Sequence, residues 1–177
     1  QNIDGDQSDL RAQRINQNME SLWNDDGGDS GKTICDAEGI QSKAKVTTFN
    51  NNVVVVWRDL RNDPDGDVYA QILDSSGDNI LTDNGVIVCD DEGQQASPRV
   101  KTDGINAFIY WEDKRFNNVD PYVQKMSVDG NFLWLNNGVQ IASDSNDQDQ
   151  VRMSVDGGGG AFFTWVDGRG DDNPEWA

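Results

Sequence analysis

The amino-acid sequence predicts an all-β protein built from a repeated unit of about 54 residues. One observation is the pattern Trp-x-Asp-x-Arg, which occurs three times at identical spacing, with its tryptophans at Trp57, Trp111 and Trp165. A second is that short apolar or alternating runs lie between clusters of Gly, Asn and Asp. No stretch shows an apolar period of about 3.6 residues over three turns. Strands and turns are therefore expected throughout the chain.

A second block of sequence repeats with small insertions. It has the pattern Asp-x-x-x-Gln, and its glutamines are Gln13, Gln71 and Gln124. Tyr69, Tyr122 and Trp176 then share one repeat position. On this basis the whole chain, 1–177, is one repeat segment. Its repeats cover about residues 9–66, 67–119 and 120–174, and residues 175–177 begin a fourth copy.

Each repeat offers four strands. In the middle repeat the expected strands lie near residues 67–74, 85–89, 98–102 and 106–112, separated by turns rich in Asp, Asn and Gly. Four strands in about 54 residues are typical of one blade of a β-propeller, and the Trp that recurs once per repeat would fill the wedge between neighbouring blades. A β-solenoid usually has shorter coils, and a string of small sandwiches needs more strands than each repeat supplies.

Three blades do not close a ring, because known propellers have about 4–8 blades. The sequence therefore predicts about three four-stranded blades of a larger ring of about six to eight. The remaining blades would come from the same, longer protein or from a second copy of this chain.

Composition excludes several functions. The chain has 177 residues with 14 Lys and Arg against 32 Asp and Glu, which gives a net charge of 14 − 32 = −18. Such a surface repels phosphate, so no nucleic-acid partner is expected. No apolar run approaches the ~20 residues of a spanning helix, so no membrane insertion is expected. The absence of histidine excludes an imidazole base and a Ser-His-Asp triad.

The repeated polar residues have both a functional and a structural interpretation. The Asp and Arg of Trp-x-Asp-x-Arg could bind a ligand, but a turn closed by a carboxylate and a guanidinium occurs once per blade by architecture alone. The repeated glutamines are expected to hydrogen-bond neighbouring backbone rather than a sugar. Cys35 and Cys89 share one repeat position and are expected to be buried thiols rather than a disulfide.

One loop has the composition of a calcium site. Asp63, Asp65 and Asp67 alternate along a tight loop that contains Gly66, and Ca²⁺ prefers such oxygen ligands. The loop lacks the distal Glu of an EF-hand, and solvated turn chemistry is the alternative interpretation. These three residues are the candidate metal ligands, and calcium is the only cofactor expected.

Together, Trp-x-Asp-x-Arg, Asp-x-Tyr-Ala-Gln and the later Asn-Gly-Val resemble a propeller repeat of large secreted and cell-surface bacterial proteins, many of them cargo of the type IX secretion system. The resemblance covers residues 9–177 and implies an extracellular location. We expect a non-enzymatic scaffold that binds a protein or glycan, for example in adhesion. The alternative is a glycan-active propeller enzyme with catalytic residues partly in other blades. Its candidate acids here are Asp90, Asp91, Glu92 and Glu112.

Overall fold

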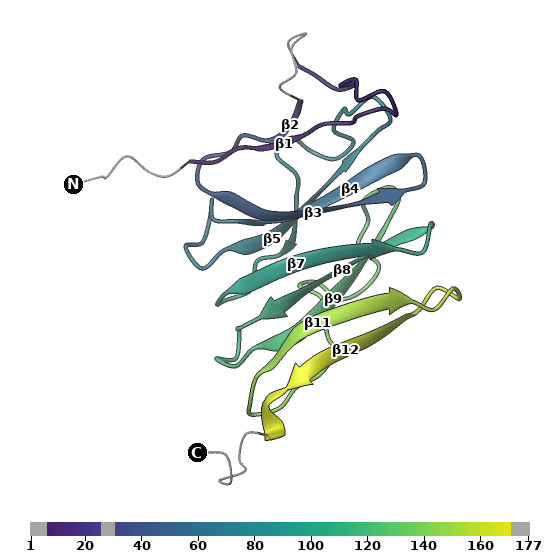
Figure 1. Cartoon of the computed structure of the whole chain (residues 1–177). Helices are drawn as coiled ribbons and strands as arrows, with labels where there is room; N and C mark the ends of the chain where they lie inside the picture. The colour runs from purple at the N-terminus through teal and green to yellow at the C-terminus, as the bar shows by residue number, and fades with distance from the viewer. Residues whose placement is uncertain (1–6, 26–30, 171–177) are drawn as a thin grey trace, which may run out of the picture.

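The computed structural model describes residues 7–25 and 31–170 as a succession of antiparallel sheets (Figure 1). The first sheet consists of β1 (Leu10–Ala12) and β2 (Lys32–Cys35). The second consists of β3 (Gln41–Phe49), β4 (Asn52–Asp59), β5 (Asp67–Leu73) and β6 (Val86–Cys89). The third consists of β7 (Gln95–Thr102), β8 (Asn106–Asp113), β9 (Asp120–Ser127) and β10 (Val139–Gln140). The fourth consists of β11 (Gln148–Val155) and β12 (Ala161–Asp167), followed by the single-turn 3₁₀ helix η1 (Gly168–Gly170).

The prediction of an all-β chain is confirmed. Each four-stranded sheet is a meander in which sequential strands pair, in the orders β3-β4-β5-β6 and β7-β8-β9-β10. The turns use residues that tolerate a positive φ. Asn50 (φ 58°) opens the β3–β4 hairpin, and Gly104 (φ 90°) lies in the β7–β8 turn. Within the described residues, no helix has the length and apolar character needed to cross a membrane.

The sheets are out of phase with the repeats drawn from the sequence. The four strands expected in the middle repeat are present as β5, β6, β7 and β8, but they belong to two sheets. The repeat boundaries near residues 66 and 119 fall between paired strands, because β4 pairs with β5 and β8 pairs with β9. A sequence period has no marked starting point, so only strand pairing shows that the sheets span residues 41–89 and 95–140.

The core lies between successive sheets. Along β4, Val54 and Val56 face the third sheet, where they share a cluster with Val100. Val55 and Trp57 face the first sheet and share a cluster with residues such as Ile34 and Cys35. Successive side chains of a strand point to opposite faces, so an unbroken apolar run identifies a sheet that is covered on both sides.

Candidate functional site

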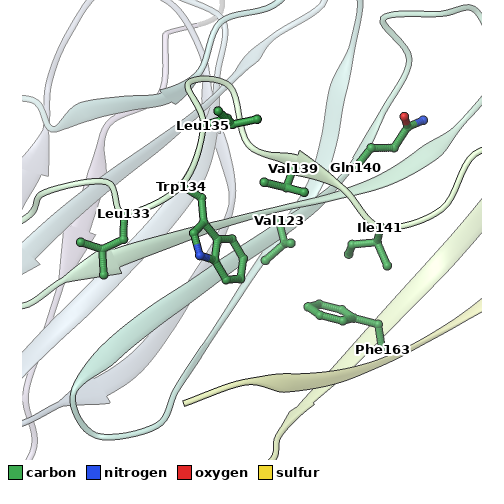
Figure 2. Close-up of a pocket in the computed structure, with 8 residues that line it drawn as sticks. All are labelled: Val123, Leu133, Trp134, Leu135, Val139, Gln140, Ile141 and Phe163. Atoms are coloured by element: carbon green, nitrogen blue, oxygen red, sulfur yellow. The ribbon is translucent and has the colours of Figure 1, made fainter.

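An apolar groove lies between the third and fourth sheets. Its volume is about 680 Å³, and it is lined by Val123, Leu133, Trp134, Leu135, Val139, Gln140, Ile141 and Phe163. Figure 2 shows Trp134, from the loop after β9, and Phe163, from β12, on either side of Val123. Leu135 is 73% exposed and Trp134 is 37% exposed, so this apolar surface is open to solvent. Sequence reasoning missed the groove, because its residues come from separate strands and loops.

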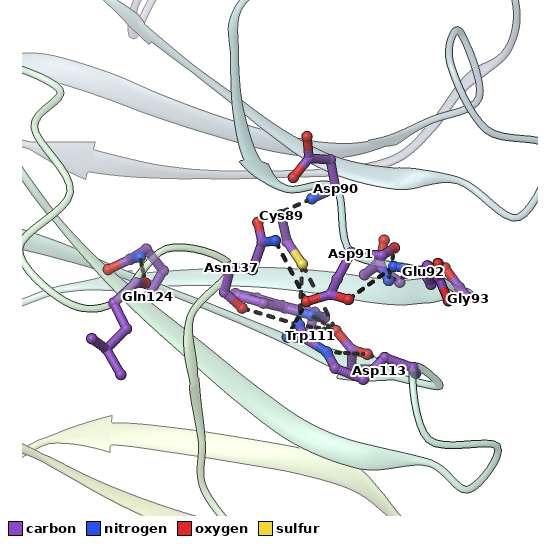
Figure 3. A network of polar contacts seen from close by, with 12 residues as sticks. Cys89, Asp90, Asp91, Glu92, Gly93, Trp111, Asp113, Gln124 and Asn137 are labelled. Carbon is purple, nitrogen blue, oxygen red and sulfur yellow. Dashed lines mark hydrogen bonds and ion pairs between the residues drawn. The ribbon is translucent and has the colours of Figure 1, made fainter.

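The Trp-x-Asp-x-Arg motif forms a closed hydrogen-bonded turn in the third sheet (Figure 3). The buried Asp113 carboxylate accepts a hydrogen bond from Trp111 Nε1 at 2.7 Å and from the Arg115 backbone N–H at 3.0 Å. The Arg115 guanidinium donates to both carboxylate oxygens, from Nε at 2.9 Å and Nη2 at 2.7 Å. Charge-assisted bonds of this kind are among the stronger ones in proteins, and here they use both oxygens of the carboxylate.

Arg115 also ties this turn to two other loops. Its Nη1 lies 2.7 Å from Asp91 Oδ2, its Nη2 donates to the Asn137 carbonyl at 3.0 Å, and its guanidinium lies 4.0 Å from the centroid of the Tyr122 ring. Burial disfavours the charged guanidinium, but the hydrogen bonds to Asp113 outweigh it and raise the pKa of Arg115. Asp91, a candidate catalytic acid, is therefore one partner in a structural network.

The same turn recurs in the second sheet. The Asp59 carboxylate accepts from Trp57 Nε1 at 2.8 Å, the Arg61 N–H at 3.0 Å and Arg61 Nη2 at 2.6 Å. Burial acts to raise the pKa of Asp59, but the hydrogen bonds from Arg61 and Trp57 dominate and lower it. Arg61 Nη2 also donates to the Asn84 carbonyl at 2.9 Å. The expectation that the motif is a turn device is confirmed.

The fourth sheet carries the third copy of the turn at its surface. Asp167 accepts from Trp165 Nε1 at 3.3 Å and from Arg169 Nε at 2.8 Å. The side chain of Arg169 is 61% exposed, compared with 10% for Arg115. The spacing of the motif is therefore sufficient to form these hydrogen bonds, whereas a neighbouring sheet is needed to bury them.

The two cysteines are free and buried, as expected. Cys89 Sγ lies 3.2 Å from Arg115 Nη2, and Cys35 Sγ lies 2.9 Å from Arg61 Nη2. Burial raises the pKa of Cys89 to about 12. This residue therefore stays a thiol at neutral pH, and a thiol is a poor nucleophile.

The repeated glutamines, at the third strand of each sheet, hydrogen-bond the loop that follows that strand. Gln124 Nε2 donates to the Leu135 carbonyl at 2.8 Å, while its Oε1 accepts from the Lys125 and Trp134 N–H groups at 2.8 and 3.2 Å. Gln71 and Gln13 make the corresponding three bonds. The amide thus hydrogen-bonds backbone groups, as expected, in all three copies.

The three candidate calcium ligands have different surroundings. Asp63 Oδ1 accepts from the Asp65 N–H at 2.7 Å, which closes the loop on itself. Asp65 is exposed, whereas Asp67 is buried at the start of β5, directly opposite Asp59 in the strand register. Among residues 7–25 and 31–170, no group of three or more Cys, Asp or Glu side chains is arranged to hold a metal ion.

Asp67 has an unusual ionisation that the sequence did not indicate. Burial, together with the nearby carboxylates of Asp63, Asp90 and Asp59, raises the pKa of Asp67 to about 6. Its repeat equivalent Asp120 also has a raised pKa, chiefly because of burial. Asp67 is 2% exposed and Asp120 is 3% exposed. Their recurrence and inaccessibility indicate a feature of the sheet rather than a general acid that meets substrate.

No protein-family model matches this chain, and no curated protein sequence or solved structure matches it either. Function must therefore be inferred from the chain's own residues. The residues that could bind a ligand fall into two groups. One group forms repeated polar networks inside the sheets, and the other consists of side chains in the loops that do not recur between copies.

Proposed function

We propose that the chain is a segment of a β-propeller, with about three blades of a ring of about six to eight, that acts as a non-enzymatic binding scaffold. The observation that carries the proposal is the repeated use of the Trp-x-Asp-x-Arg motif inside the sheets, where it holds turns together. Two four-stranded meanders in succession also support it, with β7 of one lying against β3 and β4 of the other. Stacked meanders of this kind stabilise one another through their shared faces.

The loops at one end of the strands form the proposed binding surface. Backbone hydrogen bonds join Gln95 to Gly66, Lys114 to Gln94, and Gln148 to Val119, so the loops near residues 60–66, 90–94, 114–119 and 143–147 lie together. Residues 62–66 and 116–119, which follow the arginine of each turn, differ in sequence between copies, whereas the Trp, Asp and Arg of the turn recur. Phe116, which is 63% exposed, is an aromatic side chain that such a surface offers to a protein or glycan.

A secreted or cell-surface location is part of the proposal. The resemblance to repeats of secreted bacterial proteins, including type IX secretion cargo, supports it. A net charge of −18 is compatible with an extracellular surface and opposes self-association through charge repulsion.

A glycan array and a panel of cell-surface proteins test the scaffold proposal. Binding without cleavage is expected, and Phe116→Ala should weaken it. Ile105→Ala is the matched control, since Ile105 is 72% exposed but lies at the other end of β8. Equal loss in both variants would contradict the proposed surface. Cleavage of a bound sugar would instead favour the glycan-active enzyme.

Calcium at Asp63, Asp65 and Asp67 stays a prediction, supported by the Asp-rich loop on the proposed binding surface. Calorimetric titration of Ca²⁺ after chelation should release heat in the wild type and much less in Asp65→Ala. Asp65 is exposed and its side chain can be removed without disturbing the core. Two silent titrations would remove calcium from the proposal.

A further inference from the structure

A small polar pocket lies on the proposed binding surface, between the second and third sheets. Its volume is about 320 Å³, and it is lined by Asp65, Gly93, Gln94, Lys114 and Asn117. Asp65 comes from the loop before β5, Gly93 and Gln94 come from the loop before β7, and the other two come from the turn after β8. Both sheets have four strands, so the pocket is formed by three loops from the interior of the chain.

The backbone of these loops is held by a hydrogen bond that recurs between copies. The Lys114 N–H donates to the Gln94 carbonyl at 2.9 Å. The same bond joins the Leu60 N–H to the Ile40 carbonyl at 3.0 Å, one repeat earlier. Gly93 (φ 81°) allows the close approach, because a Cβ there would lie 2.9 Å from the Lys114 carbonyl oxygen. The repeat therefore supplies a fixed backbone frame for the pocket.

The side chains on this frame differ between copies. Gln94 and Lys114 occupy the positions that Ile40 and Leu60 occupy at the preceding junction. There, two half-buried apolar side chains satisfy the same backbone architecture. The polar pair is thus not needed to hold adjacent sheets together, and its departure from the repeat indicates a role in binding.

The polar side chains of the pocket are available to a ligand. Among residues 7–25 and 31–170, no hydrogen bond or ion pair engages four of them, those of Asp65, Gln94, Lys114 and Asn117. Asp65, for example, uses only its backbone, since its carbonyl accepts from Arg58 and its N–H donates to Asp63. Together the four offer a carboxylate, an ammonium group and two amides within one small space.

We propose that this pocket binds one ring of a neutral sugar. The proposal deepens the scaffold function and rests on it, because it selects a glycan rather than a protein as the partner. A sugar hydroxyl both donates and accepts hydrogen bonds, and so do the amides of Gln94 and Asn117. Asp65 adds an acceptor and Lys114 adds a donor. A volume of about 320 Å³ is near the lower end of the range for ligand pockets, about 300–1,000 Å³, and suits a single ring.

Phe116 adds an aromatic face on which a sugar ring can pack. It lies in a turn that is closed by a hydrogen bond from the Asn117 N–H to the Lys114 carbonyl at 3.1 Å, and it is 63% exposed. The C–H groups on one side of a sugar ring are attracted to the negative face of an aromatic ring. A net charge of −18 repels an acidic sugar, so the expected ligand is neutral.

Nuclear magnetic resonance of the isotope-labelled full chain tests the pocket, because Gln94 and Asn117 have their own side-chain amide signals. The probes are methyl glycosides of glucose, galactose, mannose, fucose and N-acetylglucosamine, with glucuronic acid and sialic acid as acidic comparisons. Each is titrated in EDTA, because Asp65 is also a candidate calcium ligand. At least one neutral glycoside should shift both amide signals in a saturable manner.

The most informative variant restores the residues of the preceding junction. Gln94→Ile combined with Lys114→Leu should fold with unchanged stability, because Ile40 and Leu60 already form the same backbone bond. It should weaken sugar binding by about tenfold or more, as followed by the Asn117 signal, because two polar groups that contact the sugar are lost. Lys101→Leu is the matched control, since Lys101 is exposed at the other end of β7 and should not affect binding.

Four results would overturn the proposal: no shift with any neutral glycoside, a preference for the acidic sugars, binding only when Ca²⁺ is added, or equal binding by the double variant. Capture of a cell-surface protein with all sugars silent would overturn the sugar pocket and leave the scaffold function intact. Release of free sugar from a methyl glycoside, visible in the same spectra, would overturn the non-enzymatic function and support the pocket as a sugar site.

Discussion

The inner sheets and the end sheets carry the same repeated residues in different surroundings. Trp57 and Trp111 are completely buried, whereas Trp165 in the last sheet is only half-buried. All three tryptophans nevertheless donate a hydrogen bond to the aspartate two residues later. The comparison teaches that local spacing is sufficient to form the turn, while a neighbouring sheet is needed to bury it.

Replacing a tryptophan should give the largest difference in stability loss between the inner sheets and the last sheet. Trp111→Ala leaves a cavity between complete sheets and should lower the free energy of unfolding by about 3–5 kcal/mol. Trp165→Ala should cause a much smaller loss, because its ring is still partly in water. Urea unfolding at low protein concentration measures both variants. Equal losses would show that burial does not distinguish the inner sheets from the last one.

The carboxylate of the turn gives the next largest contrast. Asp113→Ala leaves the nearly buried Arg115 guanidinium without its main partner, which should cost about 3 kcal/mol. Asp167→Ala leaves the exposed Arg169 in water and should have little effect. The pair is compared by thermal and urea unfolding. A large effect of Asp167→Ala would indicate that the last turn is buried in solution.

Replacing a glycine in the third sheet by alanine should destabilise the protein more than the same replacement in the last hairpin. Gly138 has φ 81°, and a Cβ there would overlap the Trp111 ring, so Gly138→Ala should cost about 2 kcal/mol. Gly157, between β11 and β12, has φ 80°, and a Cβ added there would meet no atom within 4 Å. Gly157→Ala should therefore cost only about 1 kcal/mol, from backbone strain alone. Urea unfolding compares the two variants, and similar costs would remove the ring contact as the cause.

The smallest expected effect depends on pH. The pKa of Asp67 rises from 3.8 to about 6 on folding, so the native state binds more protons than the unfolded state between these values. Its contribution to stability is therefore present below pH 3.8 and is lost as pH rises through about 6. Asp67→Asn should stabilise the protein by on the order of 1 kcal/mol at pH 7, with solvent screening allowed for, and should have little effect below pH 4.

A matched control for this pH dependence is Asp9→Asn, at the equivalent position before β1. Asp9 is exposed, and its replacement removes the same charge at the surface without disturbing the core. Urea unfolding across this range measures both variants. A parallel shift in the two variants would mean that net charge, rather than the burial of Asp67, sets the effect.

The β-strands and their turns were largely predictable because their signals are local. The strands near residues 67–112 and the turn at Asp59 and Arg61 follow from alternation and from a spacing of two residues. The candidate site was less predictable. Asp63, Asp65 and Asp67 look alike in sequence, yet Asp65 is exposed and Asp67 is buried, because strand β5 carries Asp67 into the sheet beside Asp59.

The sequence by itself determined the period, the β character and the residues that close each turn, since these depend on contacts within a few residues. Tertiary structure alone decided which strands share a sheet, which copies of Trp-x-Asp-x-Arg are buried, and where the apolar groove lies. Those properties depend on contacts between different sheets, whose residues lie about one repeat of 54 residues apart in the sequence. The repeat positions of Phe108 and Val100 are therefore core in the interior of the chain, whereas their equivalents Phe162 and Val46 are exposed, because none of the described sheets covers them.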